Sequence, residues 1–134
     1  MANNVIISDA VCSAMCDAFV DLLNTGHIRM YDTPQPDGPG TAISTQTLLA
    51  ELDFANPAFG AASSGVATAE TITGETDAPD TGTVAWARFV QSDDTAVLDC
   101  TVGTSGCDIN LNAVAIVEHA TVDITALTVT QPAS

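Results

Sequence analysis

Apolar residues recur at steps of three and four near the start of the chain, within residues 9–24. The apolar positions of this segment are Val11, Cys12, Met15, Cys16, Phe19, Leu22 and Leu23. This spacing places them on one side of an α-helix, while Asp17 and Asp21 lie four residues apart on the opposite face. Ser8 is suited to cap the start of the helix, and residues 24–26 are suited to end it. The pattern predicts an N-terminal amphipathic helix with a wet acidic side and an apolar side that packs on a sheet.

From residue 27 onward, short β-branched segments alternate with Gly, Pro, Asp and Ser, which is typical of an antiparallel sandwich or barrel. The strands expected from this pattern are residues 28–31, 47–54, 66–72, 83–90, 95–102, 108–111, 113–118 and 121–129. Residues 91–94 form a connection short enough for a β-hairpin between two of these strands. The first strand of that hairpin is partly apolar on both faces, which predicts a central position in the sheet.

Residues 32–40 contain three prolines, which lack the N–H that a central strand must donate, so we expect an exposed loop there. The chain has 134 residues, about the size of one domain. The sequence as a whole predicts a mainly β fold, an antiparallel jelly-roll-like β-sandwich with one N-terminal helix. We expect a flexible arm at residues 1–8 and a single domain at residues 9–134.

The charge balance excludes several classes of partner. Arg29 and Arg88 are the two basic residues besides two histidines, and 17 acidic residues leave a formal net charge of −15. Phosphate backbones and anionic lipid surfaces would be repelled, so we expect neither nucleic-acid nor membrane binding. The apolar runs are shorter than the roughly 20 residues of a spanning helix. No secretory signal is recognised at the start of the sequence, and this predicts synthesis in a cytosol. Such acidity favours a halophilic or marine source, because salt screens the repulsion between the acidic side chains. The alternative explanation of the acidic composition is a GC-rich genome that avoids lysine codons.

Candidate chemistry is sparse in this sequence. His27 and His119 lie outside any catalytic motif, and we expect them to be edge or capping residues. A calcium site is considered for the loop carboxylates, but their spacing matches no known calcium loop, so they are expected to be solvated turn residues. These carboxylates are Asp77, Asp80, Asp93 and Asp94. We therefore predict that the protein is not an enzyme and has no metal site and no cofactor.

The four cysteines are expected to be thiols of a reducing compartment. Cys12 and Cys16 lie on one helical face with parallel Cβ directions, which is a poor geometry for a disulfide and favours free, buried thiols. Cys100 and Cys107 flank a glycine-rich turn and could face each other across a hairpin, so a bridge between them stays open. A zinc site built from all four would lack the close pairs of structural zinc motifs.

The order of small motifs along the chain carries a family resemblance. The motifs are LLNTG (22–26), IRMY (28–31), a proline-rich loop, TLLAEL (47–52), NPAFGAA (56–62), GVATA (65–69), GTVAWAR (82–88), VGTSG (102–106) and DINL (108–111). In this order the chain, over residues 9–131, resembles the small head decoration or cement proteins of tailed bacterial and archaeal viruses. The resemblance implies a structural protein of the virion that binds the major capsid protein on the outer capsid surface and is made in the host cytoplasm. It carries over no catalytic residue.

The first residues suggest how such a protein would attach. Val5, Ile6 and Ile7 precede the helix cap and are our candidate partner-binding residues, and the alternative is that they pack on the chain's own helix. Homo-oligomers are expected on a symmetric lattice, with trimers weakly favoured. A tail or head–tail connector component is the alternative within the virion. A carbohydrate- or cation-binding adhesion module is the alternative of another class, for which Trp86 and Tyr31 are the available aromatic side chains.

Overall fold

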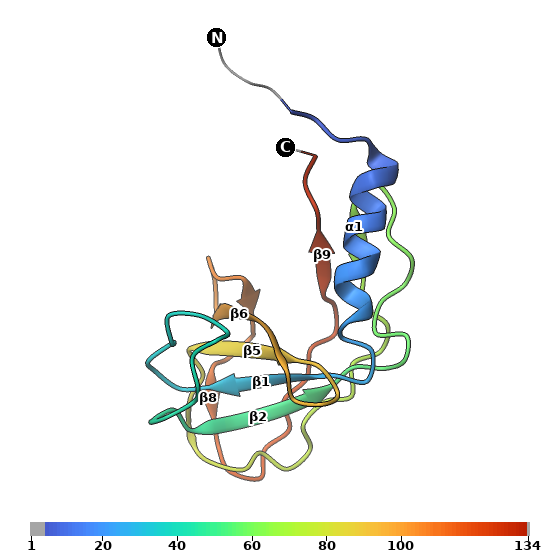
Figure 1. Cartoon of the computed structure of the whole chain (residues 1–134). Helices are drawn as coiled ribbons and strands as arrows, with labels where there is room; N and C mark the ends of the chain where they lie inside the picture. Colours follow the sequence, from blue (N-terminus) through green and yellow to red (C-terminus); the bar gives the residue numbers. More distant parts are fainter. Residues whose placement is uncertain (1–4, 134) are drawn as a thin grey trace.

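The computed structural model of the chain describes residues 5–133 and shows a mainly β fold with one helix and a curled, mostly antiparallel sheet (Figure 1). The elements are α1 (Asp9–Asp21), β1 (His27–Tyr31), β2 (Leu48–Asp53), β3 (Val66–Thr68), β4 (Gly82–Thr83), β5 (Trp86–Val90), β6 (Ala96–Gly103), β7 (Ile109–Asn110), β8 (Ala115–Ile116) and β9 (Thr128–Thr130). Within the described residues, no helix is long and apolar enough to cross a membrane.

The main sheet has five strands in the order β2-β1-β5-β6-β7. Its neighbours pair antiparallel except for β6 and β7, which run parallel. The predicted hairpin is confirmed, because β5 pairs with β6 across the connection at residues 91–94. All five residues of β5 are buried, which confirms its central position between β1 and β6. Two separate pairs, β3 with β9 and β4 with β8, complete the strand pairing.

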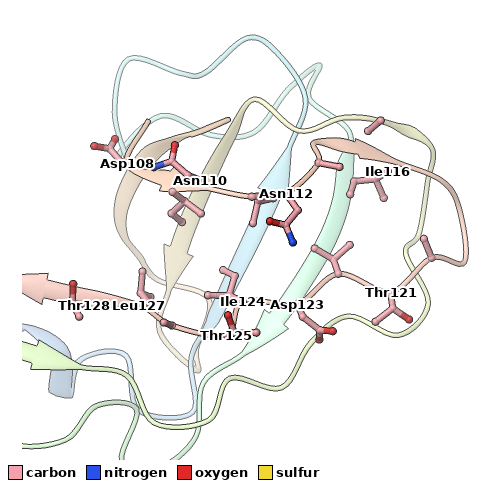
Figure 2. A pocket seen from close by; sticks show the side chains of 17 residues that line it. Asp108, Asn110, Asn112, Ile116, Thr121, Asp123, Ile124, Thr125, Leu127 and Thr128 are labelled. Atoms are coloured by element: carbon pink, nitrogen blue, oxygen red, sulfur yellow. The ribbon is translucent and has the colours of Figure 1, made fainter. Parts of the chain in front are cut away.

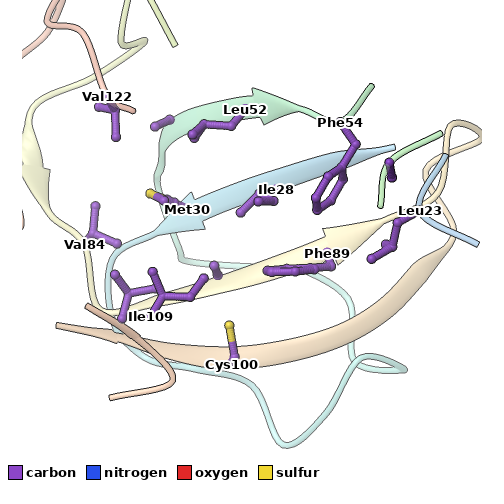
Figure 3. Close-up of a cluster of buried hydrophobic side chains, with 14 of the residues drawn as sticks. Leu23, Ile28, Met30, Leu52, Phe54, Val84, Phe89, Cys100, Ile109 and Val122 are labelled. Atoms are coloured by element: carbon purple, nitrogen blue, oxygen red, sulfur yellow. The ribbon is translucent and has the colours of Figure 1, made fainter. Parts of the chain in front are cut away.

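The hydrophobic core lies on one face of this sheet, where alternate residues of neighbouring strands meet (Figure 3). Ile28 stands opposite Leu52 on β2 and opposite Phe89 on β5, so one register position aligns three large apolar side chains. Leu23 and Phe54 close the same cluster, with the rings of Phe54 and Phe89 5.7 Å apart. Each such buried side chain contributes about 1.5–3 kcal/mol of transfer free energy, so this layer is the main source of stability.

The opposite face of the sheet is covered by the proline-rich loop. Tyr31 and Trp86 stack there with ring centroids 4.8 Å apart. The indole N–H of Trp86 donates to the carbonyl oxygen of Asp32 at 2.8 Å, and Arg88 donates to the carbonyl oxygen of Gly38 at 3.1 Å. The segment is a loop, as predicted, but it also buries the second face of the central strands.

Helix α1 begins at the predicted cap and ends earlier than predicted. The Ser8 hydroxyl accepts the backbone N–H of Val11, which confirms the N-cap. The helix stops at Asp21 instead of residue 24, because Leu22 is its C-cap and Leu23 turns into the sheet core. It packs on the narrow pair β3–β9 and stands at one end of the main sheet (Figure 1).

The later strands are shorter than predicted. The expected strand at residues 66–72 is β3, which ends at Thr68, and the one at residues 121–129 is ordered as a strand only from Thr128. Beyond the pairing of β3 with β9, Ala69 donates its N–H to the Leu127 carbonyl oxygen at 2.8 Å, and Val122 makes an isolated bridge with Glu75, which follows the first segment.

Candidate interaction surface

A groove lies along the last third of the chain, between residues 108–116 and residues 120–128 (Figure 2). Its volume is about 670 Å³, within the range of ligand pockets. The aliphatic side chains that line it, such as Ile109, Ile116 and Val122, are buried, whereas the polar ones, such as Asn112 and Asp123, are exposed. The groove therefore has an aliphatic floor and a polar rim.

Within residues 5–133, the groove offers no aromatic ring on which a sugar could stack. Its ionisable side chains are Asp108 and Asp123, and among the described residues that line it none is aromatic. The two aromatic residues considered for carbohydrate binding lie elsewhere and are covered: Trp86 is fully buried and Tyr31 is 7 % exposed. Because sugar stacking requires an accessible ring face, the expectation that Trp86 and Tyr31 are available for it is wrong.

The N-terminal arm exposes the candidate partner-binding residues. Val5 is 75 % exposed and Ile6 66 % exposed, and Ile7 is half-buried. The backbone N–H of Ile7 donates to the carbonyl oxygen of Ala133 at 3.1 Å, so the arm leaves the molecule beside the C-terminal segment. Residues 1–4 of the predicted arm lie outside the described residues. The side chains of Val5 and Ile6 point to solvent and do not pack on α1, which leaves them accessible to a partner.

The outer side of α1 continues this apolar surface. Val11, Met15 and Leu22 are each about half exposed, although the sequence pattern placed them on the packed side of the helix. Their spacing of four and seven residues puts them on one stripe. The packed side consists of Cys12, Cys16 and Val20, which face the narrow pair β3–β9. A two-stranded partner cannot cover a broad apolar face, and this is why the prediction for Val11, Met15 and Leu22 is wrong.

The predicted acidic side of the helix is also wrong in part. Asp17 is half-buried, and its carboxylate accepts the backbone N–H of Ala62 at 2.7 Å. Ser13 similarly accepts the N–H of Gly65 at 3.1 Å. These two side chains tie the helix to the loop before β3.

We call the exposed apolar residues Val5, Ile6, Val11, Met15 and Leu22 the N-terminal apolar surface. They are five of the seven large apolar residues that the described chain exposes.

A charged cluster crosses β1 and β2 on the same face as Tyr31. His27 Nδ1 lies 2.6 Å from Asp53 Oδ1, and Arg29 donates to Glu51 at 2.7 Å and to Asp94 at 2.5 Å. Sequence reasoning assigned no site here. The alternation of His27 with Arg29 and of Glu51 with Asp53 would have revealed it, because antiparallel pairing brings each basic residue opposite an acidic one.

The second histidine forms a more exposed pair. His119 Nδ1 lies 2.5 Å from Asp77 Oδ1, and its Nε2 lies 3.8 Å from Glu118. The hydrogen bond with Asp77, with the negative charges of Asp77 and Glu118, raises the pKa of His119 above its ordinary value. His119 has a positive φ of 71° and occupies a turn outside the strands, not a strand edge.

All four cysteines are free thiols. Cys12 and Cys16 are buried, as predicted. Cys100 and Cys107 do not face each other across a hairpin, the possibility that the sequence left open, because β7 runs parallel to β6. The Asp108 carboxylate accepts the N–H of Thr101 at 3.0 Å and so holds the returning chain against β6. Burial, with the negative charges of Asp108 and Asp99, raises the pKa of Cys100 to about 12, so this thiol stays protonated.

The turn carboxylates considered for calcium are held by local partners. Asp94 pairs with Arg29 and Asp77 with His119, while Asp93 and Asp80 each accept a backbone N–H, from Thr95 and Thr81. The structure therefore separates them into turns and pairs and does not gather them around one point.

Comparison of the chain with models of known protein families, with curated proteins and with solved structures finds no match.

Proposed function

We propose that this protein is a structural protein of a virion, which binds the major capsid protein on the outer capsid surface and stabilises the shell. The observation that carries the proposal is the N-terminal apolar surface. Exposed apolar patches on an otherwise charged molecule mark interaction sites, and here five such residues gather within the first 22 positions. A role of this kind needs no catalytic group, and we propose none.

The charges of the molecule agree with binding through apolar contact. Arg29 is held by Glu51 and Asp94, and Arg88 by Asp99, so both arginines are engaged inside the fold. The remaining surface is strongly acidic, which opposes nucleic acid and anionic lipid. Contact with a capsid protein would then rely on the N-terminal apolar surface, at a salt concentration that screens the acidic remainder.

The finer architecture belongs to the same proposal. We propose that the five-stranded sheet is one layer of a jelly-roll-like sandwich, and that β3–β9 and β4–β8 supply the second layer. Both pairs are short, and strands added by neighbouring copies would extend them in a homo-oligomer, for which a trimer is our first expectation. A halophilic or marine source is part of this proposal.

The decisive experiment is a cryo-electron microscopy map of the purified particle at the salt concentration of its source, with this chain traced. We expect density on the outer capsid surface, with residues 5–22 against the major capsid protein. Density confined to the neck or tail would favour a tail or connector component. Absence from the particle would refute both viral roles and return attention to an adhesion module.

A binding assay tests the surface itself. In co-sedimentation with capsids that lack this protein, the double variant Val5→Ser/Ile6→Ser is expected to bind at least about tenfold more weakly, equivalent to 1.4 kcal/mol. Val117→Ser is the matched control, because Val117 is 63 % exposed but lies outside the N-terminal apolar surface. Equal binding by both variants would show that the arm does not make the contact.

A further inference from the structure

Three metal-ligating side chains converge where β1 and β2 pair at the start of the sheet. His27 stands directly opposite Asp53 in the register, and Glu51 is two residues from Asp53 on the same face of β2. One ligand atom from each of the three lies within 4.8 Å of the others. The side chains are 24 %, 34 % and 53 % exposed for His27, Glu51 and Asp53, so an ion could reach them from solvent.

The backbone beneath these side chains is fixed on both edges. β2 pairs with β1 on one side, and on the other the N–H and C=O of Asp53 both bond to Thr73 at 2.9 Å. The N–H of Glu51 donates to the Glu75 carboxylate at 3.1 Å. A ligand set held on hydrogen-bonded strands requires less reorganisation than one held on loops, which favours binding.

Arg29 orients the cluster without neutralising it. Its Nε donates to Glu51 at 2.7 Å, while another of its nitrogens is held by Asp94. Carboxylates that ligate metals are commonly hydrogen-bonded in this way by an outer group. Glu51 and Asp94 pair with this guanidinium, while Asp53 and Glu75 add two further carboxylates beside Glu51, so the local charge remains negative and attracts a cation.

We propose that His27, Glu51 and Asp53 bind one zinc ion, or a divalent transition-metal ion of the same class. An imidazole nitrogen with two carboxylate oxygens is a ligand set of zinc, whereas calcium and magnesium select oxygen ligands alone. Around a tetrahedral zinc ion with metal–ligand distances of about 2.0–2.2 Å, two ligand atoms lie about 3.3–3.6 Å apart. The spread of up to 4.8 Å must therefore close by roughly 1.2–1.5 Å, which rotation of the partly exposed Glu51 and Asp53 side chains would supply.

This proposal does not depend on the viral role, because the site would clamp β1 to the edge strand β2 in the isolated chain. It also gives the cation-binding alternative a specific location. The loop carboxylates that raised the calcium question do not contribute to it, apart from Asp94 through Arg29.

The first test uses the natural sequence, untagged and freed of metal with a chelator. The chain has two histidines, so imidazole resonances in NMR spectra report the two sites separately. Zinc is expected to shift the resonances of His27 with saturation near one equivalent and to leave those of His119 in place. Shifts of both histidines in parallel, or no saturation near one equivalent, would overturn the proposal.

Variants then assign the ligands by calorimetric titration with zinc. Asp53→Asn keeps the shape of the side chain and is expected to weaken binding by at least about tenfold, the lower limit seen even for outer-shell changes. Asp77→Asn is the matched control, because it alters the other histidine–aspartate pair, and it should bind as tightly as the natural chain. Unchanged affinity in Asp53→Asn, or displacement of zinc by millimolar magnesium or calcium, would refute the assignment.

Discussion

Removing the carboxylate of Asp99 is expected to leave Arg88 as an uncompensated charge inside the sheet. The two side chains face each other on β5 and β6 and are 7 % and 3 % exposed. Arg88 donates two hydrogen bonds to Asp99, at 2.7 and 3.0 Å, and this pairing raises the pKa of Arg88 above its usual value. The substitution Asp99→Ala therefore breaks a buried ion pair from one side.

The size of the effect follows from what remains around Arg88. Loss of one partner of a buried pair costs about 3–5 kcal/mol. Arg88 keeps its bond to the Gly38 carbonyl oxygen at 3.1 Å and its position 5.4 Å from the centre of the Trp86 ring, a contact worth about 0.5–2 kcal/mol. Because these contacts persist, we expect Asp99→Ala to lower the free energy of unfolding by about 3 kcal/mol, at the lower end of that range.

Urea unfolding followed by tryptophan fluorescence measures this loss, because Trp86 is the single tryptophan and is fully buried. With slopes of about 1–3 kcal/mol/M, the midpoint should fall by about 1–3 M. Asp94→Ala is the control: Asp94 is 65 % exposed, so its pair with Arg29 should contribute no more than about 1 kcal/mol.

A double variant separates the charge from the packing. Arg88→Met with Asp99→Leu removes both charges and fills similar space, and such replacements of buried pairs are neutral or stabilising by about 1–4 kcal/mol. The double variant should therefore recover most of the stability that Asp99→Ala loses. A loss below about 1 kcal/mol in Asp99→Ala, or a double variant no more stable than the single one, would refute the reasoning.

Four further predictions test other parts of the molecule. Gly65→Ala should destabilise the protein by at least about 1–2 kcal/mol in the same urea assay, because Gly65 has φ +76° and an added Cβ would lie 2.5 Å from a backbone carbonyl oxygen near the C-terminus. Alkylation followed by mass spectrometry should modify the half-buried Cys107 before Cys100, whose pKa is raised to about 12 by burial, and urea should abolish the difference. An NMR titration should place the pKa of His119 above its ordinary value, and Asp77→Asn should lower it; the stabilisation from this pair is complete below the unfolded pKa of about 6.5 and is lost as pH rises through the folded pKa. The urea midpoint should rise between about 0.1 and 1 M salt, because the screening length falls from about 10 to 3 Å, and a midpoint that salt does not change would contradict a halophilic origin.

Local signals in the sequence predicted the elements that local interactions determine. The Ser8 cap, the hairpin joined by residues 91–94 and the buried strand β5 all follow from residues close together in the chain. The pairing of β3 with β9 joins segments about 60 residues apart, and the parallel hook of β7 depends on a carboxylate that returns to Thr101. Their registers are set by the three-dimensional arrangement and leave no periodic signal in either segment alone.

The candidate sites differ in the same way. The sequence left two possibilities for Val5 and Ile6, binding to a partner or packing on the chain's own helix, and the structure leaves both side chains exposed. The exposure of Met15 was not predicted, since a helical pattern shows that a side is apolar but not how wide its partner is. His27 and Asp53 are 26 residues apart, and only the antiparallel register makes them neighbours.

The register of the central strands also explains where the few positive charges are used. Arg29 and Arg88 stand directly opposite each other on β1 and β5, an arrangement of like charges that is destabilising by itself. Each is compensated by its own carboxylates, Glu51 and Asp94 for the first and Asp99 for the second. Both arginines therefore form ion pairs within the sheet, and the surface remains negatively charged. A net charge of −15 makes copies of this chain repel one another in dilute buffer, and salt weakens that repulsion by shortening the screening length.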